Sequence, residues 1–132
     1  MIRLIYMSTA KHLFSAKELE ELLDKSVENN KKIDVTGLLI TKGKTFLQCI
    51  EGEEDDVIGL YEKIKKDDRH SNVIDLIEEE CEDRLFPQWS MGFISIKDLS
   101  VIESEKIKEL EEKDIKGIEK SDVYEIFEYF IK

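Results

Sequence analysis

The sequence has little of what metal centres, disulfide-linked folds and membrane anchors require. It contains two cysteines, two histidines and one proline in 132 residues. Cys49 and Cys81 are widely separated, and the N-terminal segment MIRLIYMSTA lacks the apolar core and cleavage site of a signal peptide. We therefore expect reduced thiols that serve as small buried apolar side chains. No apolar run approaches the roughly 20 residues that span a bilayer. These absences predict a cytoplasmic protein without membrane contact.

Positive charge is scarce as well. Asp and Glu number 31 against 20 Lys and Arg, which gives a net charge of −11. Nucleic-acid binding takes much of its affinity from a basic surface, and anionic membranes attract proteins in the same way. The sequence therefore predicts neither nucleic acid nor a membrane as a partner. The hydrophobic share of 41% is typical of a globular chain, long enough for one domain with its own core.

Motifs of common enzyme chemistry are missing too. The sequence has no phosphate-binding loop, dinucleotide fingerprint, C-x-x-C pair, zinc-protease motif or G-x-S-x-G elbow. His12 and His70 are far apart, and neither has a partner at metal-ligand spacing. We expect His12 to be a plain surface residue in a loop. The residues alone thus indicate a ligand-binding α+β domain and not an enzyme.

Apolar periodicity predicts strands and helices over most of the chain. Ser15 and Glu18 have the spacing of a capping box and open a predicted helix over residues 16–32. A second helix is predicted after the acidic run EEDD, with an apolar face that includes Tyr61. Five strands are predicted. The first is IRLIYMST; the second and third, DVTGLLIT and TFLQCIEG, form a hairpin about the turn KGK. The fourth is NVIDLIEEE, and the fifth is FPQWSMGFISI, with Pro87 near its start.

This order of elements predicts a ferredoxin-like β-α-β-β-α-β sheet with a fifth strand added. Two helices cover only one face of such a sheet, yet the strand segments GLLI and FLQCI are apolar on both faces. The segments SVIESEKIKELEEKD and SDVYEIFEYFIK are predicted helices, with Ser100 and Ser121 as candidate N-caps, and they can cover the second face. We therefore expect an α+β fold with a core over residues 1–97 and a two-helix C-terminal cap over residues 98–132.

One polar residue interrupts an otherwise buried strand. In KTFLQCIEG, alternation places Phe46, Gln48 and Ile50 on one face, and Gln48 is the exception to its apolar character. A buried amide without a hydrogen-bond partner costs about 1–3 kcal/mol. If the first and third strands are neighbours, Tyr6 lies beside Gln48, and Asn30 approaches both from the first helix. Such a polar trio is typical of a binding site. The alternative is a Tyr6–Gln48 hydrogen bond that satisfies itself within the core.

Five stretches together resemble a BLUF domain, the family of blue-light sensors that bind flavin. They are RLIYMSTA, ENNKKIDVTGLLI, GKTFLQCIEG, IKKDDRH and FPQWSMGF, and they occur in family order over residues 2–93. The C-terminal segment resembles the helical cap of short, single-domain members, which makes residues 1–97 the flavin-binding core. The resemblance implies FAD as the cofactor, with FMN or riboflavin also possible. Met7 and Asp68 depart from residues common in the family, but neither belongs to the polar trio.

The resemblance also implies roles for individual residues. Tyr6 matches the electron-donating tyrosine, and Gln48 matches the glutamine that switches hydrogen bonds between that tyrosine and the flavin. Asn30 matches the asparagine at the edge of the flavin ring. Further cofactor contacts are implied for Ser26 and for Lys31 or Lys32. They are also implied for Arg69 and His70, which the family places at the end of the second helix.

Signal output is implied for Trp89 and Met91, which match the W-x-M of the fifth strand; the alternative is that both are ordinary core residues. The glutamine amide suits the switch because it has a donor end and an acceptor end. A changed hydrogen bond at Gln48 would then shift the packing of the C-terminal helices. We expect a separate downstream protein partner and a homo-oligomer. Two alternatives remain, namely a flavin-binding or redox-sensing protein without a photocycle, and a ferredoxin-like regulatory or enzyme module without flavin.

Overall fold

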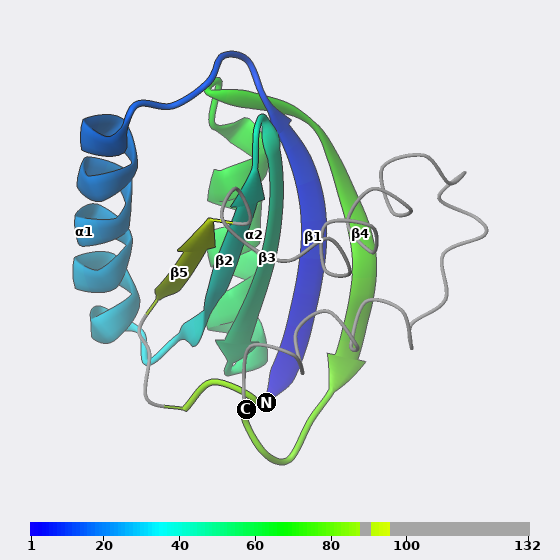
Figure 1. Cartoon of the computed structure of the whole chain (residues 1–132). Helices are drawn as coiled ribbons and strands as arrows, with labels where there is room; N and C mark the ends of the chain where they lie inside the picture. Colours follow the sequence, from blue (N-terminus) through cyan, green and yellow to red (C-terminus); the bar gives the residue numbers. More distant parts are fainter. Residues whose placement is uncertain (88–90, 96–132) are drawn as a thin grey trace.

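The computed structural model describes residues 1–87 and 91–95. In this part of the chain, five strands and two helices follow one another in the predicted order (Figure 1). They are β1 (Ile2–Ala10), α1 (Ala16–Lys32), β2 (Thr36–Lys42), β3 (Thr45–Gly52), α2 (Glu54–Lys66), β4 (His70–Glu80) and β5 (Gly92–Ser95). Neither of these two helices is long and apolar enough to cross a membrane.

The five strands form one sheet in the order β4-β1-β3-β2-β5. The pairs β1–β3, β1–β4 and β2–β3 are antiparallel, and β5 adds to the edge at β2 as a parallel strand. β1 and β3 are thus neighbours in the middle of the sheet, which confirms the ferredoxin-like prediction. Both helices pack on one face of the sheet (Figure 1). On this face, apolar side chains of α1 and α2 meet those of β1 and β3.

The first helix begins where the capping box predicted. Ser15 Oγ accepts a hydrogen bond from the backbone N–H of Glu18 at 3.1 Å, and Glu18 Oε1 accepts one from the N–H of Ser15 at 3.0 Å. The helix ends at Lys32, and its last turn brings Asn30 inward, 2% exposed. The capping box therefore fixes the start of the helix, and Asn30 faces inward near its end.

Both faces of the central strands are buried, as the apolar patterns of β2 and β3 predicted. Phe46 and Ile50 belong to the cluster under the helices. Leu38, Leu47 and Cys49 alternate to the opposite face, and each is at most 1% exposed. The two predicted C-terminal helices, expected to cover this second face, lie outside the described residues.

Several element boundaries differ from prediction. β2 begins at Thr36 rather than at residue 34, and α2 ends at Lys66 rather than near residue 70. The fifth strand begins at Gly92, and Phe86 and Pro87 lie in a bend and a turn before it, so the prediction that the strand begins at residue 86 is wrong. The fourth strand begins at His70 rather than at residue 72. Arg69 and His70 consequently follow α2 instead of ending it. Trp89 lies outside the described residues, and Met91 directly precedes β5.

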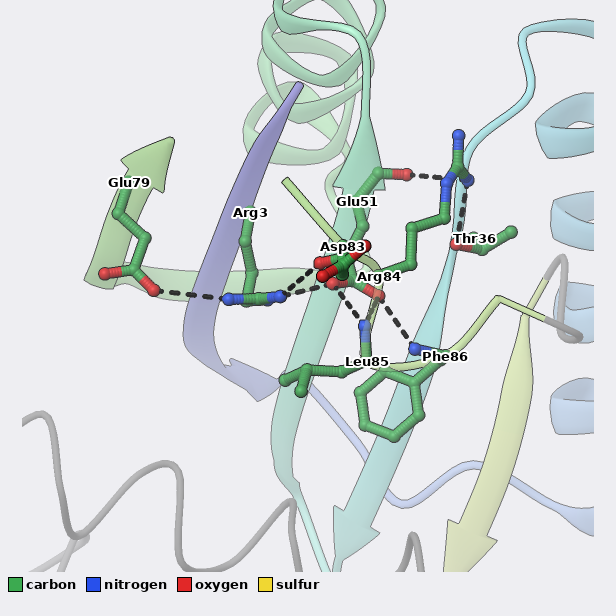
Figure 2. Close-up of polar contacts among 8 residues, drawn as sticks. All are labelled: Arg3, Thr36, Glu51, Glu79, Asp83, Arg84, Leu85 and Phe86. Carbon is green, nitrogen blue, oxygen red and sulfur yellow. Dashed lines mark hydrogen bonds and ion pairs between the residues drawn. The ribbon is translucent and has the colours of Figure 1, made fainter. Parts of the chain in front are cut away.

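A buried carboxylate fixes the segment that leads from β4 to β5. Glu51 of β3 is 0% exposed; its carboxylate accepts hydrogen bonds from the guanidinium Nε of Arg3 at 2.8 Å and from the backbone N–H groups of Leu85 and Phe86 (Figure 2). Arg3 also donates to the backbone oxygen of Asp83 at 2.8 Å. This cluster lies on the sheet face opposite the helices, and sequence periodicity gave no sign of it.

Candidate functional site

A cavity of about 340 Å³ opens between the two helices and the sheet. Its walls are mainly apolar, and its polar side chains come from separate elements. The lining consists of Tyr6, Phe14, Leu22, Lys25, Ser26, Asn29, Asn30, Leu39, Phe46, Gln48, Leu60, Lys63, Ile64, Asp67, Arg69 and His70. Apolar walls with a few convergent polar groups are typical of a small-molecule site.

Tyr6 and Gln48 lie directly opposite each other in the β1–β3 ladder. The Tyr6 hydroxyl donates a hydrogen bond to Gln48 Oε1, and Gln48 Nε2 donates one to the sulfur of Met91 at 3.3 Å. The two residues are 3% and 8% exposed. Burial raises the pKa of the Tyr6 phenol, so it stays protonated. Gln48 thus has partners within the protein, as the core-amide alternative requires, but both side chains also line the cavity.

The first helix contributes amide and hydroxyl groups along one side of the cavity. Asn30 lies in its last turn, and its backbone oxygen accepts hydrogen bonds from the N–H groups of Ile33 and Val35. Ser26 lies one turn earlier, and its hydroxyl donates to the carbonyl of Leu22 at 2.8 Å. The predicted trio of Tyr6, Gln48 and Asn30 therefore does converge on one cavity.

Basic side chains gather at the part of the lining formed by the turn after α2. Arg69 holds Asp67 through its Nε at 2.9 Å, and this hydrogen bond lowers the pKa of the Asp67 carboxyl to about 2. His70 lies between Ser8 Oγ, at 2.9 Å from its Nδ1, and the carbonyl of Ile64. Arg69 and His70 both line the cavity.

Lys31 does not line the cavity; it is exposed on α1. The lysines that do are Lys25 of α1 and Lys63 of α2. Sequence reasoning missed both, although Lys25 lies next to Ser26 and thus near the predicted site. Helical spacing could have identified it, because Lys25 lies one turn before the pair Asn29 and Asn30.

This arrangement suits a flat ring system with a polar edge and an anionic extension. The amides of Asn30 and Gln48 each have a donor and an acceptor, which match a ring edge that carries both carbonyl and N–H groups. Phe14, Phe46 and Leu39 offer apolar surface to the faces of the ring. The basic groups of the lining can offset the charge of a phosphate tail. A flavin nucleotide has all of these features.

Comparison with known proteins points in the same direction. Residues 1–92 match the family BLUF, described as sensors of blue-light using FAD. The blue light- and temperature-regulated antirepressor BluF of Escherichia coli (strain K12) is 32% identical over 94 residues, which are 71% of this chain and 23% of that protein. The chain spans less than a quarter of the length of the curated relatives it matches.

Solved structures agree with the fold. The dark-state structure of BlrB, a BLUF protein, is 28% identical with a TM-score of 0.81, and the match covers 98% of this chain and 94% of that one. A structure of Klebsiella pneumoniae BlrP1 with FMN and cyclic diGMP is 26% identical with a TM-score of 0.71, and the match covers 76% of this chain and 27% of that one.

Proposed function

We propose, from the premise that this chain belongs to the BLUF family of blue-light sensors that use flavin, that Tyr6 and Gln48 form its light-driven hydrogen-bond switch. The observation that supports the proposal most directly is the hydrogen bond from the Tyr6 hydroxyl to Gln48 Oε1 at the wall of the cavity. It joins a one-electron donor to a group that can accept the donor's proton. We propose that the chain acts as a sensor rather than as an enzyme.

The lining of the cavity and the family together support flavin binding. Asn30 and Gln48 would hold the polar edge of the ring, with Ser26 beside them. Arg69 and His70 would bind toward the phosphates, and so would the two lysines of the lining, Lys25 and Lys63; Lys31 is less well placed because it is exposed outside the lining. We propose FAD, which the family description names, and FMN is the alternative, since BlrP1 has been solved with it.

The switch uses atoms that are already in contact. When bound, a flavin supplies blue-light absorption and a strong excited-state oxidant. Tyr6 would lose one electron, and its phenol would then become a strong acid. Gln48 Oε1 already accepts the hydrogen bond of that phenol and so is the first acceptor of its proton. The Gln48 amide can afterwards rotate or change tautomer and present a different group to its neighbours.

Met91 is placed to detect such a change. Its sulfur accepts a hydrogen bond from Gln48 Nε2 at 3.3 Å, and it directly precedes β5. Rotation of the amide would replace the N–H by a carbonyl oxygen and break this contact. We propose that Met91, together with Trp89, transmits the change to residues 98–132 and from there to a separate protein partner or to another copy of the chain.

The test is an absorption spectrum of the flavin-bound protein before and after blue light, followed through recovery in the dark. We expect a small, reversible red shift in the wild type. Tyr6→Phe and Gln48→Ala should keep the flavin and lose the shift. Leu13→Ala, at a side chain 65% exposed outside the lining, should behave like the wild type. Bound flavin without any reversible shift would contradict the proposal and favour a flavin-binding or redox-sensing protein without a photocycle.

A further inference from the structure

A second buried tyrosine contacts Tyr6 from the second helix. The ring centroids of Tyr6 and Tyr61 are 5.3 Å apart at an interplanar angle of 41°. Tyr61 is 3% exposed and does not line the cavity. At this separation the two rings are in direct contact. The rate of electron transfer falls steeply as the gap between donor and acceptor widens. At contact distance, therefore, transfer between the two rings would need no bridging group.

Tyr61 also has a proton acceptor. Its hydroxyl donates a hydrogen bond to Asp75 Oδ1 of β4. Burial and the neighbouring carboxylate both raise the pKa of the Tyr61 phenol, so it is protonated until it is oxidised. Asp75 itself is exposed, so a proton that reaches it can pass on to water. The Tyr61–Asp75 pair therefore has the two parts of a proton-coupled electron donor, a phenol and a base.

We propose that Tyr61, with Asp75 as its proton acceptor, is a secondary electron donor that returns an electron to Tyr6 after the excited flavin has oxidised it. The proposal rests on the proposed function, because photo-oxidation of Tyr6 by flavin supplies the oxidant. In the step, one electron passes from Tyr61 to the one-electron-oxidised Tyr6, which is still protonated and carries a positive charge. The Tyr61 hydroxyl proton passes to the Asp75 carboxylate. Tyr6 returns to a neutral phenol, Tyr61 becomes a neutral radical, and Asp75 becomes a carboxylic acid.

This step competes with the switch. Tyr6 can either give its proton to Gln48, which begins the hydrogen-bond change, or receive an electron from Tyr61, which restores Tyr6 and leaves Gln48 unchanged. The Tyr61 route therefore lowers the yield of red-shifted protein per absorbed photon. It also leaves a radical on Tyr61 that survives longer than one on Tyr6, because Tyr61 does not line the cavity and so lies farther from the flavin that holds the transferred electron.

The ammonium of Lys65 predicts the direction in which a substitution changes electron donation by Tyr61. Lys65 Nζ lies over the Tyr61 ring, 4.9 Å from its centroid, and pairs with Glu62 Oε1 at 2.8 Å. A positive charge at the face of the ring opposes the removal of an electron from it. Lys65→Gln should therefore make Tyr61 a better donor, whereas Tyr61→Phe removes the donor.

The experiment measures two quantities on the flavin-bound protein, namely the tyrosyl radical signal by electron paramagnetic resonance after blue illumination and freezing, and the yield of the red shift per absorbed photon. Tyr61→Phe should lower the radical signal severalfold and raise the yield of the shift. Asp75→Asn keeps an oxygen acceptor for the hydroxyl but is a much weaker base, so it should lower the signal as well. Lys65→Gln should raise the radical signal and lower the yield. A purely structural role for Tyr61 would not produce these opposite changes.

The outcomes separate the two proposals. A wild-type protein with a Tyr6-dependent shift, in which Tyr61→Phe and Asp75→Asn leave both quantities unchanged, would overturn the secondary-donor role and leave the photoreceptor function intact. A wild-type protein without any reversible shift would overturn both. Because Phe preserves the ring that packs on Tyr6 and Asp75 is already exposed, we expect both variants to fold, and retained flavin confirms it.

Discussion

The buried ion pair of Arg3 and Glu51 should be strongly coupled in the free energy of unfolding. Arg3→Met would leave the Glu51 carboxylate at 0% exposure, and the donors that remain to it among the described residues are the backbone N–H groups of Leu85 and Phe86. Removing one partner of a buried pair costs about 3–5 kcal/mol. Glu51→Leu would instead remove the carboxylate that accepts from those two N–H groups, at about 1–3 kcal/mol for each lost hydrogen bond, or about 2–6 kcal/mol in total.

The double variant separates the two effects. In Arg3→Met/Glu51→Leu the stranded carboxylate no longer exists, and the cost should be close to that of Glu51→Leu alone, about 2–6 kcal/mol. If the sites were independent, the costs would add to about 5–11 kcal/mol, which rivals the whole stability of a typical domain. The expected coupling is therefore about 3–5 kcal/mol, and it arises because the two side chains stabilise each other.

Urea unfolding followed by far-UV circular dichroism measures each free energy. Lys32→Met is the matched control, because it removes the same charge from an exposed pair 3.9 Å from Glu28 and should cost under about 0.5 kcal/mol. If Arg3→Met cost no more than Lys32→Met, or if the two single costs simply added, the pair would not be the buried, mutually dependent cluster that the geometry indicates.

Three further predictions concern local structure. Ser15→Ala should lower stability by about 1 kcal/mol in urea unfolding, because it removes the side-chain cap of α1. Gly37→Ala should prevent normal pairing of β2 with β3, since a Cβ would lie 1.9 Å from the carbonyl oxygen of Cys49, and the variant should be insoluble or melt far below the wild type. Arg69 lowers the pKa of Asp67 to about 2, so the ionised carboxylate stabilises the fold above its ordinary pKa near 3.8, and this contribution is lost as the pH falls from about 4 toward 2. Wild type should therefore exceed Asp67→Asn in thermal stability at pH 6, and the difference should shrink over that window.

Local signals were sufficient for most elements. The capping box gave the start of α1, and the alternation in TFLQCIEG gave β3 together with its two buried faces. The neighbouring positions of β1 and β3 followed from the ferredoxin-like order, and this placed Tyr6 beside Gln48. These features depend either on residues close in sequence or on the usual strand order of a ferredoxin-like sheet. A single sequence could therefore predict them.

The segment before β5 could not be predicted in the same way. Phe86 is 1% exposed, and in the sequence it continues the apolar pattern of the strand that follows. The pattern therefore predicts one more inward-facing strand residue at this position. Its backbone N–H, however, donates to the side-chain carboxylate of Glu51, whereas a residue in a strand pairs with the backbone of its neighbour. Periodicity reports burial but not the partner of the backbone, so a buried turn and a buried strand give the same signal.

The contact between Tyr61 and Asp75 was hidden for a different reason. From Ile5, which pairs with Ile77, regular antiparallel pairing would place Tyr6 opposite Leu76. A register shift between Ile5 and Tyr6 places Asp75 there instead. Such a bulge adds one unpaired residue to one strand, and nothing in the local sequence of β4 marks it. The acid beside the two tyrosines is therefore a product of tertiary pairing.

The two polar clusters of β3 hold the same segment with unequal strength. On one face, Glu51 binds the backbone of Leu85 and Phe86 through charge-assisted hydrogen bonds in a fully buried setting. On the other face, Gln48 holds Met91 through one hydrogen bond to a thioether, which is a weak acceptor. A rotation of the Gln48 amide would cost little at Met91 and far too little to release Glu51. Under the proposed switch, the end of the segment at Glu51 stays fixed, so we expect the displacement to be largest on the side of Met91 and β5.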